Sequence, residues 1–246
     1  MKPTFDLGKG TYFGGKGAAG VVHTIINQMP AHNTFISGFL GKCAVMRWKH
    51  PAKQNIGIDL DSGLIAEWRE SIRNNVSLEL IETSFLSWKG QPLDLSDSFL
   101  YLDPPYLPET RSGSNKYKFE LTIANHVELL EKASSLPCMV AISCYDSTLY
   151  RKKLKDWRKI QFNSQTRGGT RVETLYMNYP EPIPQKLHDT RFLGTNFRDR
   201  ERGKRRIETI KRKIERLEPK EKAPQQSTLR GFLLKNPLPG LRKRAT

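Results

Sequence analysis

The 246 residues suffice for one α/β domain with an appendage, and a hydrophobic fraction of 37% is low for a chain that packs throughout. No secretory signal opens the chain and no apolar run approaches ~18 residues, so we expect a soluble, cytoplasmic protein with no membrane partner. The three cysteines form no CxxC pair, which argues against a structural zinc site and a disulfide framework, and we expect no metal.

The net charge of +16 indicates a polyanionic partner, most simply nucleic acid. This charge is unevenly spread, because residues 186–246 hold 19 Lys and Arg against 7 Asp and Glu. We therefore expect a nearly balanced folded domain over residues 1–190 and a basic, helical or flexible tail over residues 191–246.

Seven short apolar runs, rich in β-branched or aromatic residues, predict strands, and helical patterns lie between several of them. The strand runs are 34–40, 55–60, 78–81, 98–102, 138–143, 159–162 and 172–179. Helices are predicted over 18–29, from Asp61 through Ile72, and over 122–135. This alternation predicts an α/β fold with a mostly parallel seven-stranded sheet and helices on both faces. In such a sheet, ligands bind at the carboxyl ends of the strands.

The first glycine-rich stretch is "TYFGGKGAAG", residues 11–20, which precedes a predicted helix. Backbone N–H groups at a helix start, together with a lysine, suit an anionic group. The spacing of a GxxxxGK[ST] phosphate loop is absent, so this turn is weak evidence by itself.

Two strand ends then suggest a ligand that contains a nucleoside. In "FISGFLGKCAV", residues 35–45, Gly41 lets the backbone approach a ligand closely. Asp59 ends the next strand, 18 residues beyond Gly41, where dinucleotide-type folds place the acid that binds ribose hydroxyls. Asp61 is better placed to cap the following helix, which leaves Asp59 for the ligand. No GxGxxG is present, so the ligand is not expected to be NAD.

The stretch "LYLDPPYLPET", residues 100–110, holds the clearest candidate for chemistry. Two prolines stop the strand at Asp103 and make the turn stiff. Asp103 and the Pro104 carbonyl can accept two hydrogen bonds from one exocyclic amine, while Pro105 braces the turn and Tyr106 offers a surface on which a base can stack.

The pattern over residues 197–219 predicts a basic amphipathic helix, weakened by Gly203 and stopped at Pro219. Its apolar positions recur at spacings of three and four: Ile207, Ile210, Ile214 and Leu217. We favour contact with nucleic acid over a merely solvated docking helix, because positive charge is concentrated here.

Asp-Pro-Pro-Tyr behind a strand, with a glycine turn upstream, resembles the S-adenosylmethionine-dependent adenine-N6 methyltransferases, and most of all the Dam-type DNA adenine methylases. Five motifs occur in the family's order over most of the first ~180 residues. The resemblance implies a Rossmann-like methyltransferase fold, S-adenosylmethionine as cofactor, and methyl transfer to the N6 amino group of adenine in DNA.

The resemblance also implies roles for individual residues. Tyr12 and Lys16 would border the methyl donor, and Asp59 would hold its ribose. The residues expected at the donor are Tyr12, Lys16, Phe39, Gly41, Asp59, Ser84 and Asp103. The residues expected to be catalytic are Asp103, Pro104, Pro105 and Tyr106.

The donor loop departs from the family pattern. Ser37 and Gly38 stand where the family has Glu-Pro, Cys43 replaces a glycine, and Lys42 adds a charge. A catalytically degenerate, nucleic-acid-binding protein that keeps the fold is therefore one alternative.

A second departure concerns recognition, because only 17 residues separate Phe85 from Asp103, too few for the recognition domain that Dam-type enzymes carry there. The expected partner is duplex DNA with the target adenine flipped out, and no obligate protein partner is inferred. An RNA adenine methyltransferase is the nearest enzymatic alternative. The residues expected to bind nucleic acid are Arg111, Lys116, Lys118, Arg167, Arg171, Lys204, Arg205 and Arg206.

Overall fold

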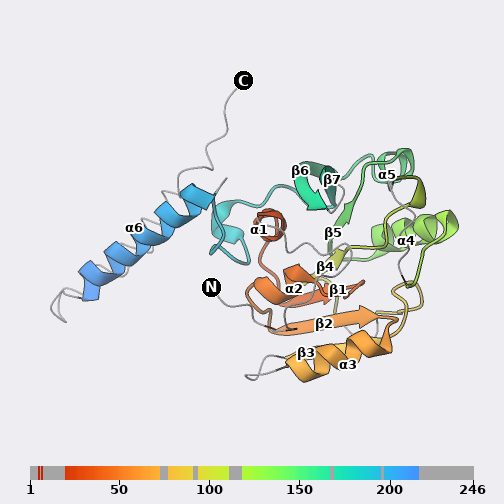
Figure 1. The fold of residues 1–246 in the computed structure, drawn as a ribbon, viewed down its shortest axis with the longest axis horizontal. Helices are drawn as coiled ribbons and strands as arrows, with labels where there is room; N and C mark the ends of the chain where they lie inside the picture. Colours follow the sequence, from red (N-terminus) through yellow and green to blue (C-terminus); the bar gives the residue numbers. More distant parts are fainter. Residues whose placement is uncertain are drawn as a thin grey trace.

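The computed structural model of the chain describes Phe5, Leu7 and residues 20–72, 77–90, 94–110, 118–166, 169–194 and 197–215. These residues form a seven-stranded sheet in the order β3-β2-β1-β4-β5-β7-β6 (Figure 1). β1 to β5 run parallel, and β7 is antiparallel to both of its neighbours. The strands are β1 (Thr34–Ser37), β2 (Gln54–Asp59), β3 (Leu78–Glu82), β4 (Ser98–Leu102), β5 (Met139–Cys144), β6 (Arg158–Thr166) and β7 (Gly169–Met177). The predicted mostly parallel α/β sheet is confirmed.

Helices cover both faces of this sheet, also as predicted. α1, α2 and α3 pack on one face, while α4 and α5 pack on the other. The helices are α1 (Val21–Ile26), α2 (Ala44–Trp48), α3 (Ser62–Ser71), α4 (Ile123–Ser135), α5 (Thr148–Lys153) and α6 (Phe197–Glu215), with short 3-10 turns η1 (Pro108–Thr110) and η2 (Pro184–Lys186).

The strand sequences divide the core between the two faces. Phe35 and Phe99 belong to the cluster under α1, α2 and α3, whereas their neighbours Ile36 and Leu100 belong to the cluster under α4 and α5. All four side chains are fully buried. This two-sided burial explains why the strands read as nearly continuous apolar runs.

Capping residues fix where the two longest helices of the domain begin. The Asp61 carboxylate accepts hydrogen bonds from the N–H groups of Gly63 and Leu64. Thr122 forms a capping box with Asn125 at the start of α4. Both predicted starts are confirmed, whereas α2 and α5, with five and six residues, are too short to give a periodic signal.

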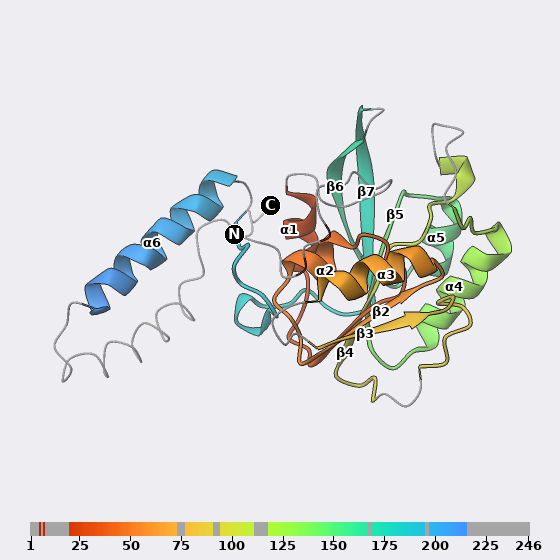
Figure 2. The same cartoon turned by 60° about the horizontal axis from the view of Figure 1, so that its bottom comes forward.

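Beyond the end of their neighbour β5, β6 and β7 continue as a two-stranded arm (Figure 2). β5 pairs with β7 only as far as Thr174, but the β6–β7 ladder runs on to Thr166 and Gly169. The arm therefore projects beyond the carboxyl end of β5.

The basic helix predicted from the periodicity is present as α6, which projects away from the sheet domain in both views (Figure 1, Figure 2). Gly203 lies inside it, and Pro219 lies outside the described residues. Among the described residues, no helix combines the length and apolarity that a membrane crossing requires.

Candidate active site

A pocket with about 980 Å³ of empty space, partly open to solvent, lies at the carboxyl ends of β1, β2, β3 and β4. Its position matches the ligand site of open α/β sheets. It brings together the five donor-site residues that fall within the described ranges: Phe39, Gly41, Asp59, Ser84 and Asp103. Tyr12 and Lys16 lie outside the described residues.

The turn at Gly41 is held from two sides. Its N–H donates to the Asp59 carboxylate at 2.7 Å, and its carbonyl accepts from the Trp68 indole N–H at 2.7 Å. Gly41 has φ 44°, in the left-handed region that favours glycine. The loop after β1 is thus fixed to the end of β2 and to α3, with its backbone on the pocket wall.

Asp59 is the acid at the end of β2, and its two oxygens accept from the N–H groups of Gly41 and Asp61. Burial raises the pKa of Asp59 above its usual value, and these N–H groups oppose that change. Each carboxylate oxygen has a second lone pair that can accept a ligand hydroxyl.

Lys118, predicted to contact nucleic acid, lies on the wall of this pocket. Its ammonium group is 3.0 Å from the Asp61 carboxylate. The hydrogen bond from Lys118 is the main cause of the lowered pKa of Asp61. The exposed Phe119 beside it also lines the pocket, so Lys118 and Phe119 form the part of the wall next to the start of α3.

Two of the unusual residues of the loop after β1, Lys42 and Cys43, have partners in the fold. Lys42 forms an ion pair with Glu67 of α3 at 3.0 Å, which partly neutralises its charge. The Cys43 thiol caps α2 by accepting from the Met46 N–H at 3.4 Å, and burial raises the pKa of Cys43.

Gly38, which replaces the family's proline, is required by packing. A Cβ at this position would lie 2.5 Å from Leu102 and 2.8 Å from Phe85, closer than side-chain carbons approach. Its N–H donates to the Tyr101 carbonyl at 3.0 Å. The absence of a side chain lets the donor loop pass directly over β4 and over Phe85 of the pocket wall.

The wall after β3 is held by a lysine from α4. The Lys132 ammonium donates to the carbonyls of Phe85, Leu86 and Trp88, with distances of 2.7 Å and 2.8 Å to the first two. Desolvation lowers the pKa of Lys132. This one side chain therefore fixes the turn that presents Ser84 and Phe85 to the pocket.

The turn behind β4 joins the pocket to a buried network. Asp103 and Pro105 line the cavity, and Pro104 is buried. The Tyr106 hydroxyl lies 3.3 Å from Asp103 Oδ1 and 3.0 Å from Glu173 Oε2, and both of these oxygens are acceptors. Since a hydroxyl has one proton, the two carboxylates compete for it.

Tyr106 is only 5% exposed in this structure. Its ring packs edge-to-face on Tyr145, with centroids 4.5 Å apart at 61°. The predicted stacking surface is thus covered by Tyr145 in this structure.

The residues predicted to bind nucleic acid are dispersed. Arg171 lies on the β6–β7 arm, and Arg205 and Arg206 are exposed on α6. The side chain of Lys204 is not among those described. Three others lie outside the described residues: Arg111, Lys116 and Arg167.

Sequence reasoning missed three residues of the site: Trp68, Lys132 and Glu173. Trp68 is visible in the sequence as an apolar position of α3, but its bond to a distant loop is not. Glu173 is likewise visible only as an acid in a strand of mixed polarity, and its bond to the turn behind β4 is not.

Among the described residues, no group of His, Cys, Asp and Glu could hold a metal ion. Asp59, Asp61 and Asp103 all line the pocket, but the first two carboxylates are already engaged by backbone N–H groups and Lys118.

No protein-family model and no curated protein matches the sequence. Among solved structures, the chain is similar to a Streptococcus mutans protein provisionally described as a methyltransferase and solved with SAH (15% identity, 63% of this chain, 94% of that chain, TM-score 0.43). It is also similar to an rRNA methylase from Streptococcus thermophilus (11% identity, 63% and 93% coverage, TM-score 0.43) and to the 23S rRNA methyltransferase ErmE (13% identity, 76% and 73% coverage, TM-score 0.41). At these identities and TM-scores, the likenesses carry no argument about substrate or reaction.

Proposed function

We propose that this protein transfers a methyl group from S-adenosylmethionine to the N6 amino group of adenine in DNA. The observation that carries the proposal is the position of Asp103 on the wall of the pocket that also holds Asp59 and Gly41. An amine acceptor and a ribose-binding acid thus face one cavity.

The residues of the pocket fit the proposed cofactor. Asp59 would accept the ribose hydroxyls, and the glycine turn at Gly41 would let the cofactor approach the backbone closely. When bound, the cofactor supplies a methyl group on a positively charged sulfur.

Asp103 and the Pro104 carbonyl would bind the two hydrogens of the target amine. This makes the nitrogen more tetrahedral and directs its lone pair at the methyl carbon. Asp103 or solvent would accept the proton that the amine loses after it has gained the methyl group. No covalent link to the protein is required.

Tyr106 would stack on the flipped adenine after its ring leaves Tyr145. A turn of the ring about its own axis leaves the hydroxyl in place, so the 3.0 Å hydrogen bond to Glu173 would still hold Tyr106 when the base stacks.

The altered donor loop does not favour the degenerate alternative. Lys42 is paired with Glu67, and Cys43 serves as a helix cap, so neither departure leaves an unpartnered group on the pocket wall. An active methyltransferase must bind S-adenosylmethionine, whereas a degenerate protein need not, and titration calorimetry measures this binding directly.

The reaction is tested with methyl-labelled cofactor on duplex DNA and, in parallel, on structured RNA. The proposal predicts label in N6-methyladenine from the DNA arm. Label confined to the RNA arm would replace the substrate with RNA, and folded protein that binds cofactor but labels neither would refute the proposal.

A further inference from the structure

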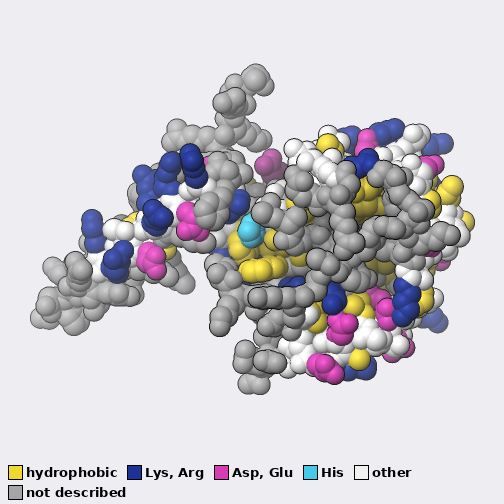
Figure 3. All heavy atoms as spheres, in the orientation of Figure 1, with side chains coloured by type: hydrophobic (Ala, Val, Ile, Leu, Met, Phe, Trp, Pro, Cys, Tyr) yellow, Lys and Arg dark blue, Asp and Glu magenta, His cyan; other side chains and the backbone are white. Residues whose placement is uncertain are grey.

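Six cations share one face of α6, all of them exposed. At 3.6 residues per turn they fall in a sector about 120° wide, and within Phe197–Glu215 no Asp or Glu falls inside it. Figure 3 shows dark blue side chains gathered along this helix. We call this set the basic face: Arg198, Arg202, Arg205, Arg206, Arg212 and Lys213.

The basic face is a stripe. From Arg198 to Lys213 the helix rises by roughly 22 Å at 1.5 Å per residue. The four acidic positions of the helix lie outside the sector: Asp199, Glu201, Glu208 and Glu215. A linear array of phosphates complements such a stripe better than a compact anion does.

The segment before α6 is attached to the sheet domain close to the start of β1. Leu187 pairs with Pro30, and the His188 N–H donates to the Met29 carbonyl at 3.0 Å. Met29 and Pro30 lie just before β1, which starts at Thr34. The attachment is therefore at the amino ends of the strands.

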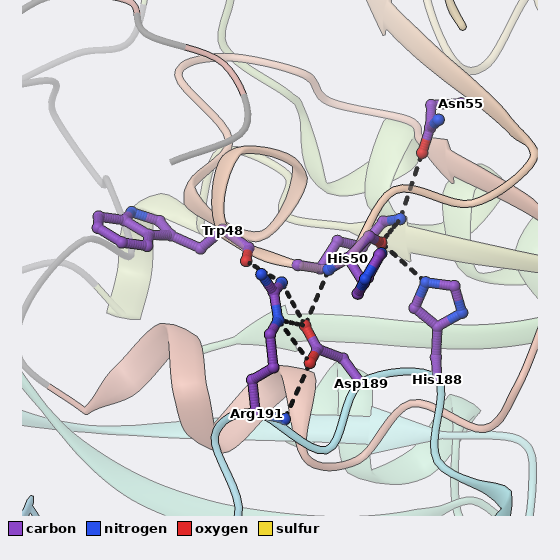
Figure 4. Close-up of polar contacts among 7 residues, drawn as sticks. Trp48, His50, Asn55, His188, Asp189 and Arg191 are labelled. Atoms are coloured by element: carbon purple, nitrogen blue, oxygen red, sulfur yellow. Dashed lines mark hydrogen bonds and ion pairs between the residues drawn. The ribbon is translucent and has the colours of Figure 1, made fainter. Parts of the chain in front are cut away.

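Asp189 strengthens this attachment. It is 2% exposed, accepts from the His50 N–H at 2.8 Å and pairs with Arg191 at 2.7 Å (Figure 4). Arg191 in turn donates to the Trp48 carbonyl at 2.9 Å (Figure 4). Trp48 and His50 come shortly before β2, so these contacts also lie at the amino ends of the strands.

The turn at Asp103 lies at the opposite ends of the strands, because Asp103 follows β4 and the pocket is formed by the carboxyl ends of four strands. α6 begins at Phe197, only a few residues beyond Arg191, and projects outward (Figure 1). The basic face and the pocket are thus at opposite ends of the domain.

We infer that the basic face of α6 is a second DNA contact, which binds backbone phosphates remote from the target adenine. This inference rests on the proposed function in taking DNA as the partner. Phosphate contacts carry no sequence information, so the stripe would retain the protein on DNA while the site at Asp103 works elsewhere on the molecule.

The inference predicts that duplex length matters. A folded domain of this size is about 40 Å across. A duplex of 10 base pairs, roughly 34 Å long, cannot reach both ends, whereas one of 40 base pairs can.

The test neutralises four cations of the basic face in the full chain, with Arg198, Arg202, Arg205 and Arg206 replaced by Gln. A matched control neutralises four exposed cations of the sheet domain: Lys53, Arg69, Lys152 and Lys155. Circular dichroism verifies that both variants keep their helices. Dissociation constants are then measured without cofactor on 10- and 40-base-pair duplexes over a range of salt concentrations.

On the 40-base-pair duplex, the slope of log affinity against log salt should fall in magnitude by about 3–4 in the α6 variant, at ~0.9 per lost phosphate contact. The unmodified chain and the control should bind the 40-base-pair duplex more tightly than the 10-base-pair duplex, which can occupy only one end of the domain at a time, and this advantage should shrink in the α6 variant. Equal affinity of the unmodified chain for the two duplexes, equal losses in the control, or no binding of the 40-base-pair duplex by the unmodified chain would overturn the inference.

Two further arms separate this inference from its alternatives. Binding to phosphatidylserine vesicles that depends on the basic face, without an effect on the long duplex, would assign the stripe to a membrane surface instead. Because the DNA arms need no methyl transfer, a length-dependent effect in a protein that methylates nothing would uphold this inference and refute the proposed function.

Discussion

The Tyr106 hydroxyl lies 3.0 Å from Glu173, and this contact joins the turn behind β4 to β7, two strands away in the sheet. Glu173 is 3% exposed and belongs to β7, outside the pocket wall. It therefore acts on the turn through Tyr106 and not on the cofactor.

Replacing Glu173 with Ala should lower the turnover number about 10-fold, which corresponds to ~1.4 kcal/mol of transition-state stabilisation. The Tyr106 hydroxyl would then lose its bond to Glu173 and bond to Asp103, an acceptor that the amine needs. Glu173→Gln keeps a carbonyl acceptor and should retain most of the activity. Cofactor affinity should stay constant in both variants, and a parallel loss of that affinity would contradict this role.

Trp68→Phe removes the hydrogen bond to the Gly41 carbonyl and should weaken cofactor binding by about 5-fold, the equivalent of ~1 kcal/mol. Titration calorimetry measures this change. Trp157→Phe is the matched control, since Trp157 packs against the core cluster on the other face. If both variants bind the cofactor equally well, the bond from Trp68 does not position the loop.

Gly38→Ala should reduce the free energy of unfolding by ~1–3 kcal/mol, because the new methyl group meets Leu102 and Phe85. Urea denaturation measures this loss. Gly63→Ala is the control: it lies in the exposed first turn of α3, where the nearest atom to a new Cβ is Asp61 Oδ1 at 3.3 Å. If Gly38→Ala lowers the free energy of unfolding no more than Gly63→Ala does, the loop after β1 shifts to make room for the methyl group at little cost.

Two stacked histidines should make the protein sensitive to acid. The rings of His32 and His188 lie 3.8 Å apart, and burial is the main cause that lowers their pKa values to about 2 and about 4. Lys49 nearby lowers both further. Between pH 6.5 and 4, the unfolded chain therefore binds more protons than the folded one.

The free energy of unfolding should fall across this window as the pH falls, by about 1.4 kcal/mol per pH unit for each histidine. Urea denaturation at pH 7, 6 and 5 measures the slope. His188→Gln removes one of the two histidines and should make the slope shallower. An unchanged slope in that variant would assign the acid sensitivity to other groups.

Much of the fold could be predicted from the sequence because the central strands β1, β2, β4 and β5 are buried on both faces and read as apolar runs. The helix starting at Ser62 was predictable from its cap. The Asp61 carboxylate accepts hydrogen bonds from N–H groups only two and three residues further along the chain. The short helices α2 and α5 could not be predicted, because one or two turns give no period.

In the candidate site too, residues with a local sequence signal were predictable and residues placed by tertiary packing were not. Asp59, Gly41 and Asp103 were predictable because each directly follows a strand, and parallel strands bring their carboxyl ends together. Glu173 and Lys132 were not, because they reach the site from distant elements through tertiary packing alone. The covered position of the Tyr106 ring depends on Tyr145, and no local pattern encodes that contact.

The central claim is that the pocket at Asp59 delivers a methyl group to an adenine amine held at Asp103. The most direct measurement is a single turnover, in which the chain is loaded with methyl-labelled S-adenosylmethionine and then mixed with adenine-containing duplex DNA. The account predicts that label leaves the cofactor and appears as N6-methyladenine, while Asp103→Ala still binds cofactor but transfers at least ~100-fold more slowly. Equal transfer by the Asp103→Ala variant, or label at any position other than N6 of adenine, would contradict it.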